Sequence, residues 1–256
     1  MTGDIFAIFD DFIQWKKLLV EKNIKERDFW SEKLPVIYNH FQSLDYILCT
    51  AFLDIEKRIQ GRKKNSPSLN YHRPSASSIK KLRPVYWGCA TTSEGPTYEK
   101  HLQLSVHLSR GPWMHEPREA LPEDHIAIKL SFFRTVDAEV LRLIKRKLHR
   151  DPETFLDLLR ELKSQDSLFT FYRSIGDRNE RERIDDFDVW GGAIKDELLR
   201  YDEDWKEGVA IPRSTEFLKF VQWKGVRDKF QTAPLAIEYI KGEINKLLPL
   251  FYFLTS

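Results

Sequence analysis

The chain has very few cysteines, and this scarcity limits both its compartment and its chemistry. Its two cysteines, Cys49 and Cys89, lie far apart in the sequence, and neither belongs to a CxxC motif or a Cys/His cluster. A disulfide framework or a structural zinc site would need more of them. Free thiols are typical of a reducing cytosol, so we expect a cytoplasmic protein with no metal site and no cofactor.

Long apolar runs are missing as well. A membrane span needs about 18–20 apolar residues, whereas the apolar C-terminal run 247–254 is short and contains Pro249. The segment 1–12 has acidic residues where a signal peptide needs basic ones, and it has no small-residue cleavage site. We therefore expect a soluble, intracellular protein without a membrane partner.

The chain also has no excess of one charge, because 41 Lys and Arg residues face 39 Asp and Glu residues. This balance argues neither for nor against nucleic acid as a partner. Hydrophobic residues make up 41% of the chain and aromatic residues 13%, which is too much for a disordered protein. With 256 residues, the chain can form one large domain or two small ones.

Residues 101–109 show the clearest pattern in the chain, a strict alternation of polar and apolar residues. Side chains alternate between the two faces of a strand, so this pattern predicts one dry face and one solvent-facing polar face. Segments 85–90, 125–133 and 167–173 are further candidate strands. Since the strands are not each followed by a crossover helix, the sequence favours an α+β fold, with an antiparallel sheet flanked by helices.

Helices are indicated by apolar residues at steps of three and four. The clearest are 41–59, 136–148, 152–162 and 234–248. The start of the third is marked by a capping Asp, a Pro at the first helical position and a Glu in the first turn.

The remaining segments complete the predicted organisation. Ser214 is interpreted as the cap of another helix, and 176–192 as a polar loop. We expect an N-terminal helical segment at 1–60, a basic loop at 61–84 and an α+β domain at 85–256, with a single domain for all three as the alternative.

The second half of the chain carries runs that point to a family. They follow a candidate strand at 125–133 and read EVLRLIK (139–145), DPETF (151–155), LRYDED (199–204), EFLK (216–219) and LPLFYFL (248–254). In these runs the chain resembles a widespread family of bacterial conserved hypothetical proteins, catalogued as domain of unknown function 2461. PTYEKH (96–101) is similar to a Pro-Tyr-Lys-Thr-His element of that family. The resemblance covers roughly half of the chain, departs from it at the basic loop, and implies an α+β fold but no established activity.

Two histidines lie on the polar side of the alternating strand, His101 and His107. Six residues of a straight strand span about 20 Å, so the two side chains cannot share one metal. Each would need a partner from a neighbouring strand, and His125 or Lys129 could supply it. One interpretation is a phosphodiester hydrolase, His-based or metal-dependent, in which the histidines do acid/base work and Lys129 stabilises charge. The others are a ligand-binding face and a face covered by solvent or by a partner.

A second cluster of basic residues lies on the predicted helix 136–148 and just beyond it. Arg142 and His149 are seven residues apart, a spacing found in a family of helical ribonucleases, and the residues between and after them would suit RNA. That family is all-helical, whereas this helix follows a strand. The plainer interpretation is a solvated helix end, where cations complement the helix dipole.

The stretch 57–83 is the strongest hint of function after the strand, because it contains basic residues and no acid. Such a field attracts phosphates, and Tyr71 could stack on a base. We expect a binding module for nucleic acid or a phosphorylated ligand, formed by this loop and the polar sheet face. Such a module would suit an accessory component of a larger bacterial system, for example a defence system. The candidate binding residues are Lys57, Arg58, Arg62, Lys63, Lys64, Tyr71, Arg73, Lys80, Lys81 and Arg83.

A third hypothesis is a protein–protein interaction component. It rests on tryptophans that could dock on a protein partner, namely Trp87, Trp113, Trp190 and Trp205.

Overall fold

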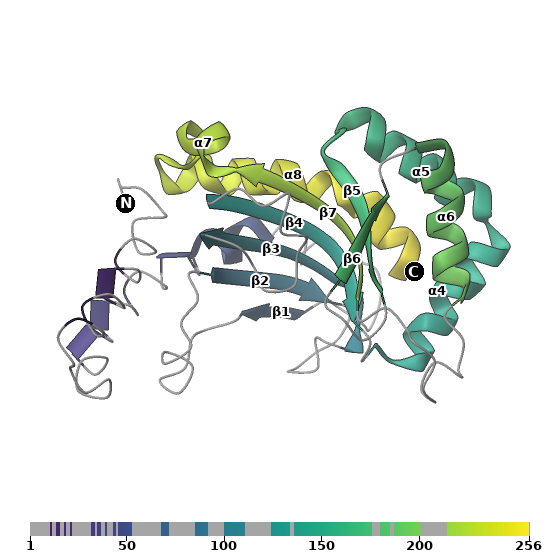
Figure 1. Ribbon diagram of the computed structural model, residues 1–256, viewed down its shortest axis with the longest axis horizontal. Helices are drawn as coiled ribbons and strands as arrows, with labels where there is room; N and C mark the ends of the chain where they lie inside the picture. Colours follow the sequence, from purple (N-terminus) through teal and green to yellow (C-terminus); the bar gives the residue numbers. More distant parts are fainter. Residues whose placement is uncertain are drawn as a thin grey trace.

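A computed structural model gives the fold of the chain (Figure 1). It describes scattered positions between 11 and 52, and then residues 68–71, 85–91, 100–110, 124–133, 136–175, 180–184, 187–200 and 214–255.

The centre of the fold is a seven-stranded sheet in the order β1-β2-β3-β4-β7-β5-β6, in which every neighbouring pair is antiparallel. Together with the helices, it confirms the predicted α+β fold. The strands are β1 (Ser68–Tyr71), β2 (Val85–Thr91), β3 (Gln103–Arg110), β4 (Asp124–Phe133), β5 (Phe169–Ile175), β6 (Glu180–Ile184) and β7 (Ser214–Gln222).

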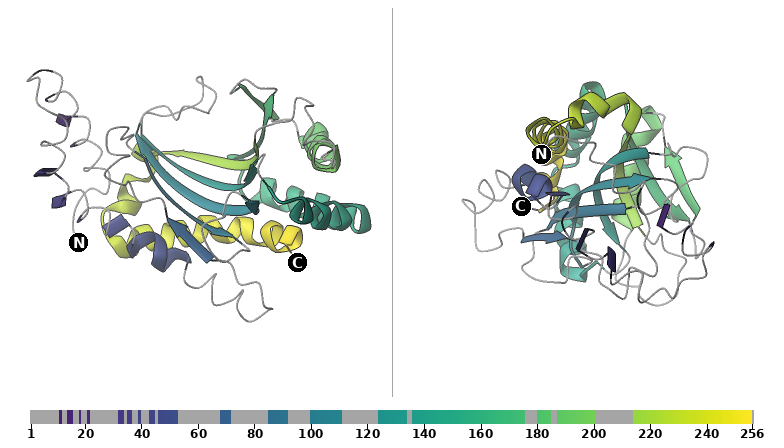
Figure 2. Two further views of the ribbon diagram at one scale, coloured as in Figure 1. Left: turned by 90° about the horizontal axis from the view of Figure 1, so that it is seen from below. Right: turned by 90° about the vertical axis from the view of Figure 1, so that its left-hand side faces the viewer.

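Helices cover one face and one end of this sheet (Figures 1 and 2). The long C-terminal helix α8 lies along the apolar face, and the helical positions between 43 and 52 lie beside it. At the other end, α4, α5 and α6 form a group next to the β5–β6 hairpin. The helices are α4 (Ala138–Arg150), α5 (Pro152–Gln165), α6 (Phe187–Arg200), α7 (Trp223–Val226), the 3-10 helix η3 (Arg227–Phe230) and α8 (Ala233–Thr255).

One large hydrophobic core joins the sheet to all of these layers. The apolar positions of the alternating strand, such as Leu104 and Val106, are fully buried in it, and so is Ile240 of α8. Leu48 and Phe52 of the N-terminal helical segment belong to the same core. These described positions of the segment therefore pack into the same core as the sheet. Within the described residues, no helix combines the length and the apolar character needed to cross a membrane.

Asp151 joins α4 to α5 and serves both helices. Its backbone N–H donates to the Lys147 carbonyl at 2.9 Å, which closes the last turn of α4. Its carboxylate accepts from the Thr154 N–H at 3.3 Å and caps α5, with Pro152 next in the chain. The helix start that the sequence indicates at this point is confirmed.

Replacing Asp151 with alanine is expected to lower the free energy of unfolding by about 1 kcal/mol, the usual cost of losing an N-cap. Asn keeps a capping oxygen, so Asp151→Asn is the matched control and should lose much less. Urea unfolding curves of the three proteins measure the difference. Equal losses for Ala and Asn would show that the carboxylate's charge, and not its capping bond, stabilises α5.

Two predictions in the second half of the chain are wrong. The helix expected after Ser214 is the strand β7, which lies between β4 and β5. The run that follows Ser214 imitates helical spacing because a strand in the middle of a sheet carries apolar residues on both faces. The polar loop expected at 176–192 contains β6 and the beginning of α6. β6 is an edge strand of the sheet, a position in which charged residues are common.

Candidate functional site

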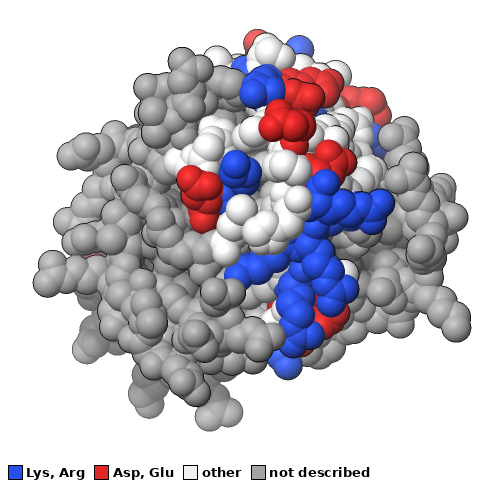
Figure 3. Space-filling view, turned by 90° about the vertical axis from the view of Figure 1, so that its right-hand side faces the viewer, with Lys and Arg blue, Asp and Glu red and all other residues white. Residues whose placement is uncertain are grey.

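The exposed face of α4 carries a cluster of basic side chains. The helix packs on the core through Leu141, Ile144 and Leu148, which follow one another at steps of three and four. Its opposite face carries mostly basic side chains. In Figure 3, Lys and Arg side chains gather in one continuous band on the side of the molecule where α4, α5 and α6 lie.

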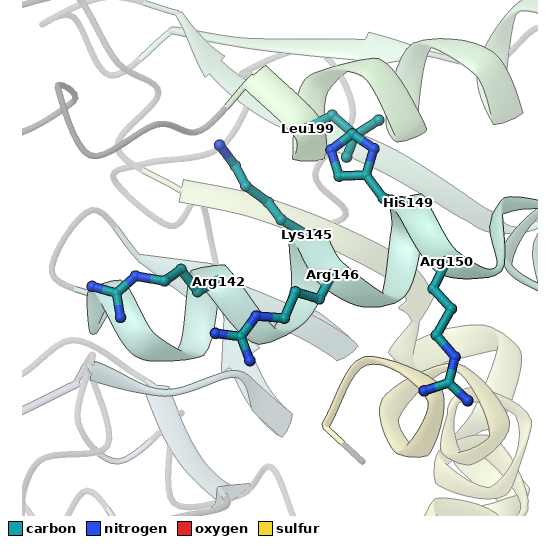
Figure 4. A pocket seen from close by; sticks show the side chains of 6 residues that line it. All are labelled: Arg142, Lys145, Arg146, His149, Arg150 and Leu199. Carbon is teal, nitrogen blue, oxygen red and sulfur yellow. The ribbon is translucent and has the colours of Figure 1, made fainter.

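An open groove of about 770 Å³ runs along this face of α4. The basic residues form two rows on the helix (Figure 4). Lys145 and His149 point toward α6, where Leu199 forms the far wall, and the arginines point to the other side of α4. The groove is lined by Arg142, Lys145, Arg146, His149, Arg150 and Leu199. We call this set, without Leu199, the α4 basic face.

The described residues of α4 include one acid. Glu139, in the first turn of α4, is the helix's one carboxylate, and it accepts a hydrogen bond from the Arg142 guanidinium at 2.5 Å. Both side chains are half exposed, so the pair is screened by solvent and worth little. Lys147 turns away from the groove, since its ammonium lies 5.6 Å from the centre of the Phe253 ring of α8. Within the described residues of α4, basic side chains therefore outnumber acidic ones.

The basic loop predicted at 61–84 lies largely outside the described residues. Only 68–71 are described, as the edge strand β1, so the backbone of Tyr71 is in the sheet and the other candidate binding residues of the loop have no described position. The side chains of the four tryptophans proposed for protein docking also lie outside the described set.

The polar face of the alternating strand is buried, and the prediction that it faces solvent is wrong. His107 is 8% exposed, and His125 and Lys129 of β4 are 0% and 4% exposed. The face lies opposite the large core and contains only a small apolar cluster of its own, Ala127 with Tyr172. Alternation in the sequence separates two faces, but it does not say whether the polar one meets water or protein. The buried polar residues on this face are Gln103, Ser105, His107, His125, Lys129, Ser131, Thr170 and Glu216.

The sheet brings three of the four predicted catalytic candidates together. His107 pairs with Ala127, so His125 and Lys129 are its two diagonal neighbours on β4, as expected for partners from an adjacent strand. The Nε2 atom of His107 lies 3.1 Å from the hydroxyl of Ser105. The ammonium of Lys129 lies 3.7 Å from the carboxylate of Glu216 on β7.

His101 does not belong to this group. It precedes β3, whose first residue is Gln103, and its neighbour Lys100 accepts a hydrogen bond from the backbone N–H of Asp137 at 2.8 Å. Burial lowers the pKa of the His101 imidazole below its ordinary value, against the opposing effect of the Asp137 charge. Among the residues that the structure describes, no three His, Cys, Asp or Glu side chains are placed to hold a metal ion.

A buried charge cluster, which sequence analysis missed, joins three elements on the apolar side of the sheet. Lys219 of β7 contacts Asp166, at the end of α5, and donates to Glu243 of α8 at 2.5 Å. Lys246 donates to Asp166 at 2.8 Å and to Glu243 at 3.0 Å. Two ammonium groups thus neutralise two carboxylates. Because Asp166 and Lys219 lie far from each other and from the Glu243–Lys246 pair in the sequence, no local motif indicates the cluster.

Comparison with known proteins finds no match for this chain among family models, curated proteins or solved structures. The resemblance to domain of unknown function 2461 stays a prediction.

Proposed function

We propose that this protein binds the phosphate backbone of a nucleic acid, and that the α4 basic face makes the contact. The observation that supports the proposal is the groove itself, whose lining includes Arg142, Lys145, Arg146, His149 and Arg150 on two sides of one helix. Guanidinium groups bind phosphate oxygens through two parallel hydrogen bonds, and such charge-assisted bonds are stronger than neutral ones. The buried sheet face cannot offer a surface of this kind.

The spacing of the arginines favours a polymer over a small phosphorylated molecule. Arg142, Arg146 and Arg150 follow one another at steps of four, so each is about 6 Å further along the helix axis, and the row spans about 12 Å. A single phosphate would engage one or two of these side chains. A nucleic-acid strand presents a charge about every 3.4 Å of duplex axis, so it can engage all three.

Replacing Arg142, Arg146 and Arg150 together with glutamine is expected to weaken nucleic-acid binding about 100-fold, at about 1 kcal/mol for each lost contact. Glutamine keeps helix propensity, so α4 should persist. The slope of log affinity against log salt concentration should also become shallower by about 2.7, since each phosphate contact contributes about 0.9. Fluorescence anisotropy with labelled nucleic acids across a salt series measures both quantities.

Two variants serve as controls. Arg160→Gln removes an exposed arginine of α5, which pairs with Asp157 at 2.6 Å, and should leave affinity unchanged. Glu139→Gln removes the acid that competes with phosphate for Arg142, and it should tighten binding modestly. If the triple variant binds like the wild type, or if Arg160→Gln weakens binding equally, α4 is not the contact surface and the proposal fails.

A further inference from the structure

We infer that the ligand of the α4 basic face is double-stranded nucleic acid, held by its backbone without reading of the base sequence. This inference rests on the proposed function and specifies its ligand. It follows from three features of the groove: what its lining contains, how regularly its charges are placed, and how rigid its support is.

Among the described residues that line the groove, none is a Phe, Tyr or Trp. Proteins that bind single strands combine a basic groove with aromatic side chains, because unpaired bases offer apolar faces worth about 1–3 kcal/mol each on stacking. Of the described residues that line this groove, five are basic or imidazole side chains and the sixth is Leu199. A duplex hides its base faces inside its own stack and presents phosphates, and phosphates are what these side chains suit.

The arginine row is regular and is held by the core. Arg142, Arg146 and Arg150 occupy successive turns of one helix, whose other face is anchored by Leu141, Ile144 and Leu148. A duplex is stiff, with a persistence length of about 150 base pairs, so its phosphates already stand at fixed intervals. A flexible single strand would lose conformational freedom on matching the same row, and that loss weakens binding.

The position of α4 in the fold, rather than its residue types, argues against sequence recognition. Bases are read in the major groove by bidentate Arg, Asn or Gln contacts from an element that enters the groove. Here α4 lies against α5 and α6, and it shares its exposed groove with the end of α6, so one flank of the helix is closed. This arrangement lets the arginines reach a backbone passing over the surface. It does not let the helix enter a groove as a recognition helix does.

The test compares a duplex with each of its two separated strands, at equal length and across a salt series, using the full-length chain. One duplex is DNA and a second, of the same sequence, is RNA. We expect both duplexes, or one of them, to bind at least about tenfold more tightly than either single strand, which is a difference of about 1.4 kcal/mol. Shuffling the duplex sequence should leave the affinity unchanged. The difference in affinity between the DNA and RNA duplexes then shows which of the two backbone geometries the arginine row binds more tightly.

The outcomes separate this inference from the proposed function. Binding that is equal or tighter for single strands, or that changes with the shuffled sequence, overturns the inference and leaves phosphate binding by α4 in place. No binding of any nucleic acid at low salt overturns both. The triple arginine variant should lose its preference for duplex together with its affinity, whereas Arg160→Gln should keep both.

Discussion

Replacing Lys219 with methionine is expected to destabilise the fold by about 3–5 kcal/mol, the largest loss we expect from a single substitution of a charged residue in this chain. Lys219 is 4% exposed and lies between two carboxylates, those of Asp166 and Glu243. Methionine fills a similar volume, so packing changes little. Most of the cost is the charge of two carboxylates left in the protein interior with Lys246 as their remaining partner in the cluster.

Removing one of the two carboxylates should restore part of the stability that Lys219→Met loses. Adding Glu243→Gln to Lys219→Met removes one of the uncompensated charges, so the double variant should be more stable than Lys219→Met alone. Urea unfolding of the wild type, both single variants and the double variant gives the coupling energy. If the double variant loses the sum of the single losses, Lys219 stabilises the fold through its aliphatic stem and not through its charge.

The pH dependence of stability gives a second readout of the cluster. Burial by itself would raise the pKa of Asp166, but hydrogen bonds from Lys219 and Lys246 outweigh burial, and the pKa lies below its ordinary value. A carboxyl whose pKa is lowered by folding stabilises the protein above its unfolded pKa, and this contribution is lost as the pH falls through the folded pKa. The wild type should therefore lose this part of its stability in acid, and Lys219→Met should lose less of it.

The lysine Lys246 of the cluster contributes a pH dependence of stability in the opposite direction. Burial lowers the pKa of the Lys246 ammonium, but hydrogen bonds to Asp166 and Glu243 outweigh burial and raise it. A raised pKa stabilises the folded state below the unfolded pKa of the amine, and the contribution disappears as the pH rises through the folded pKa. Burial, with the charges of Glu243 and Asp166, also raises the pKa of the Tyr239 phenol above its ordinary value.

The sequence could predict those parts of the fold that are determined by residues close together in the chain. The helix α4 and the Asp151-Pro152 helix start are indicated by residues close together in the chain, and both are confirmed, although Leu143, which was predicted to face the core, is exposed. That β7 is a strand could not be predicted from its own segment, because its apolar pattern depends on its central place in the sheet, which buries both of its faces. The burial of His125 could not be predicted from its own segment either, since covering a face takes segments from elsewhere in the chain.

The candidate site could likewise be predicted only where neighbouring residues determine it. The sequence places Arg142 and His149 on one helix, and the structure puts both in one groove. What it could not show is which side of that helix the core would leave open, or that Leu199 of α6 would form the opposite wall. The charge cluster around Lys219 lay beyond sequence analysis altogether, because Asp166 and Glu243 come from separate elements.

The second large change in stability is expected at the Lys129–Glu216 ion pair on the polar face of the sheet. Both side chains are almost fully buried, at 5% and 2% exposure, with 3.7 Å between the ammonium and the carboxylate. Lys129→Met should cost about 3 kcal/mol or more, because it leaves the Glu216 carboxylate buried without this partner. Combining Lys129→Met with Glu216→Leu should recover most of the loss, since apolar residues of similar volume commonly replace a buried ion pair at little cost. Urea unfolding of the four proteins measures the coupling.

The stabilities of these four proteins also bear on why this face of the sheet is polar. A double variant as stable as the wild type would show that folding does not require the pair, and that the polar face is kept for another purpose. Measuring duplex binding by the same variant then separates the two faces of the molecule. Unchanged affinity would confine binding to the α4 side, whereas weakened affinity in a fully stable protein would show that the polar face shapes the binding surface. A double variant less stable than Lys129→Met would contradict the desolvation argument, and would show that the pair holds its strands in register.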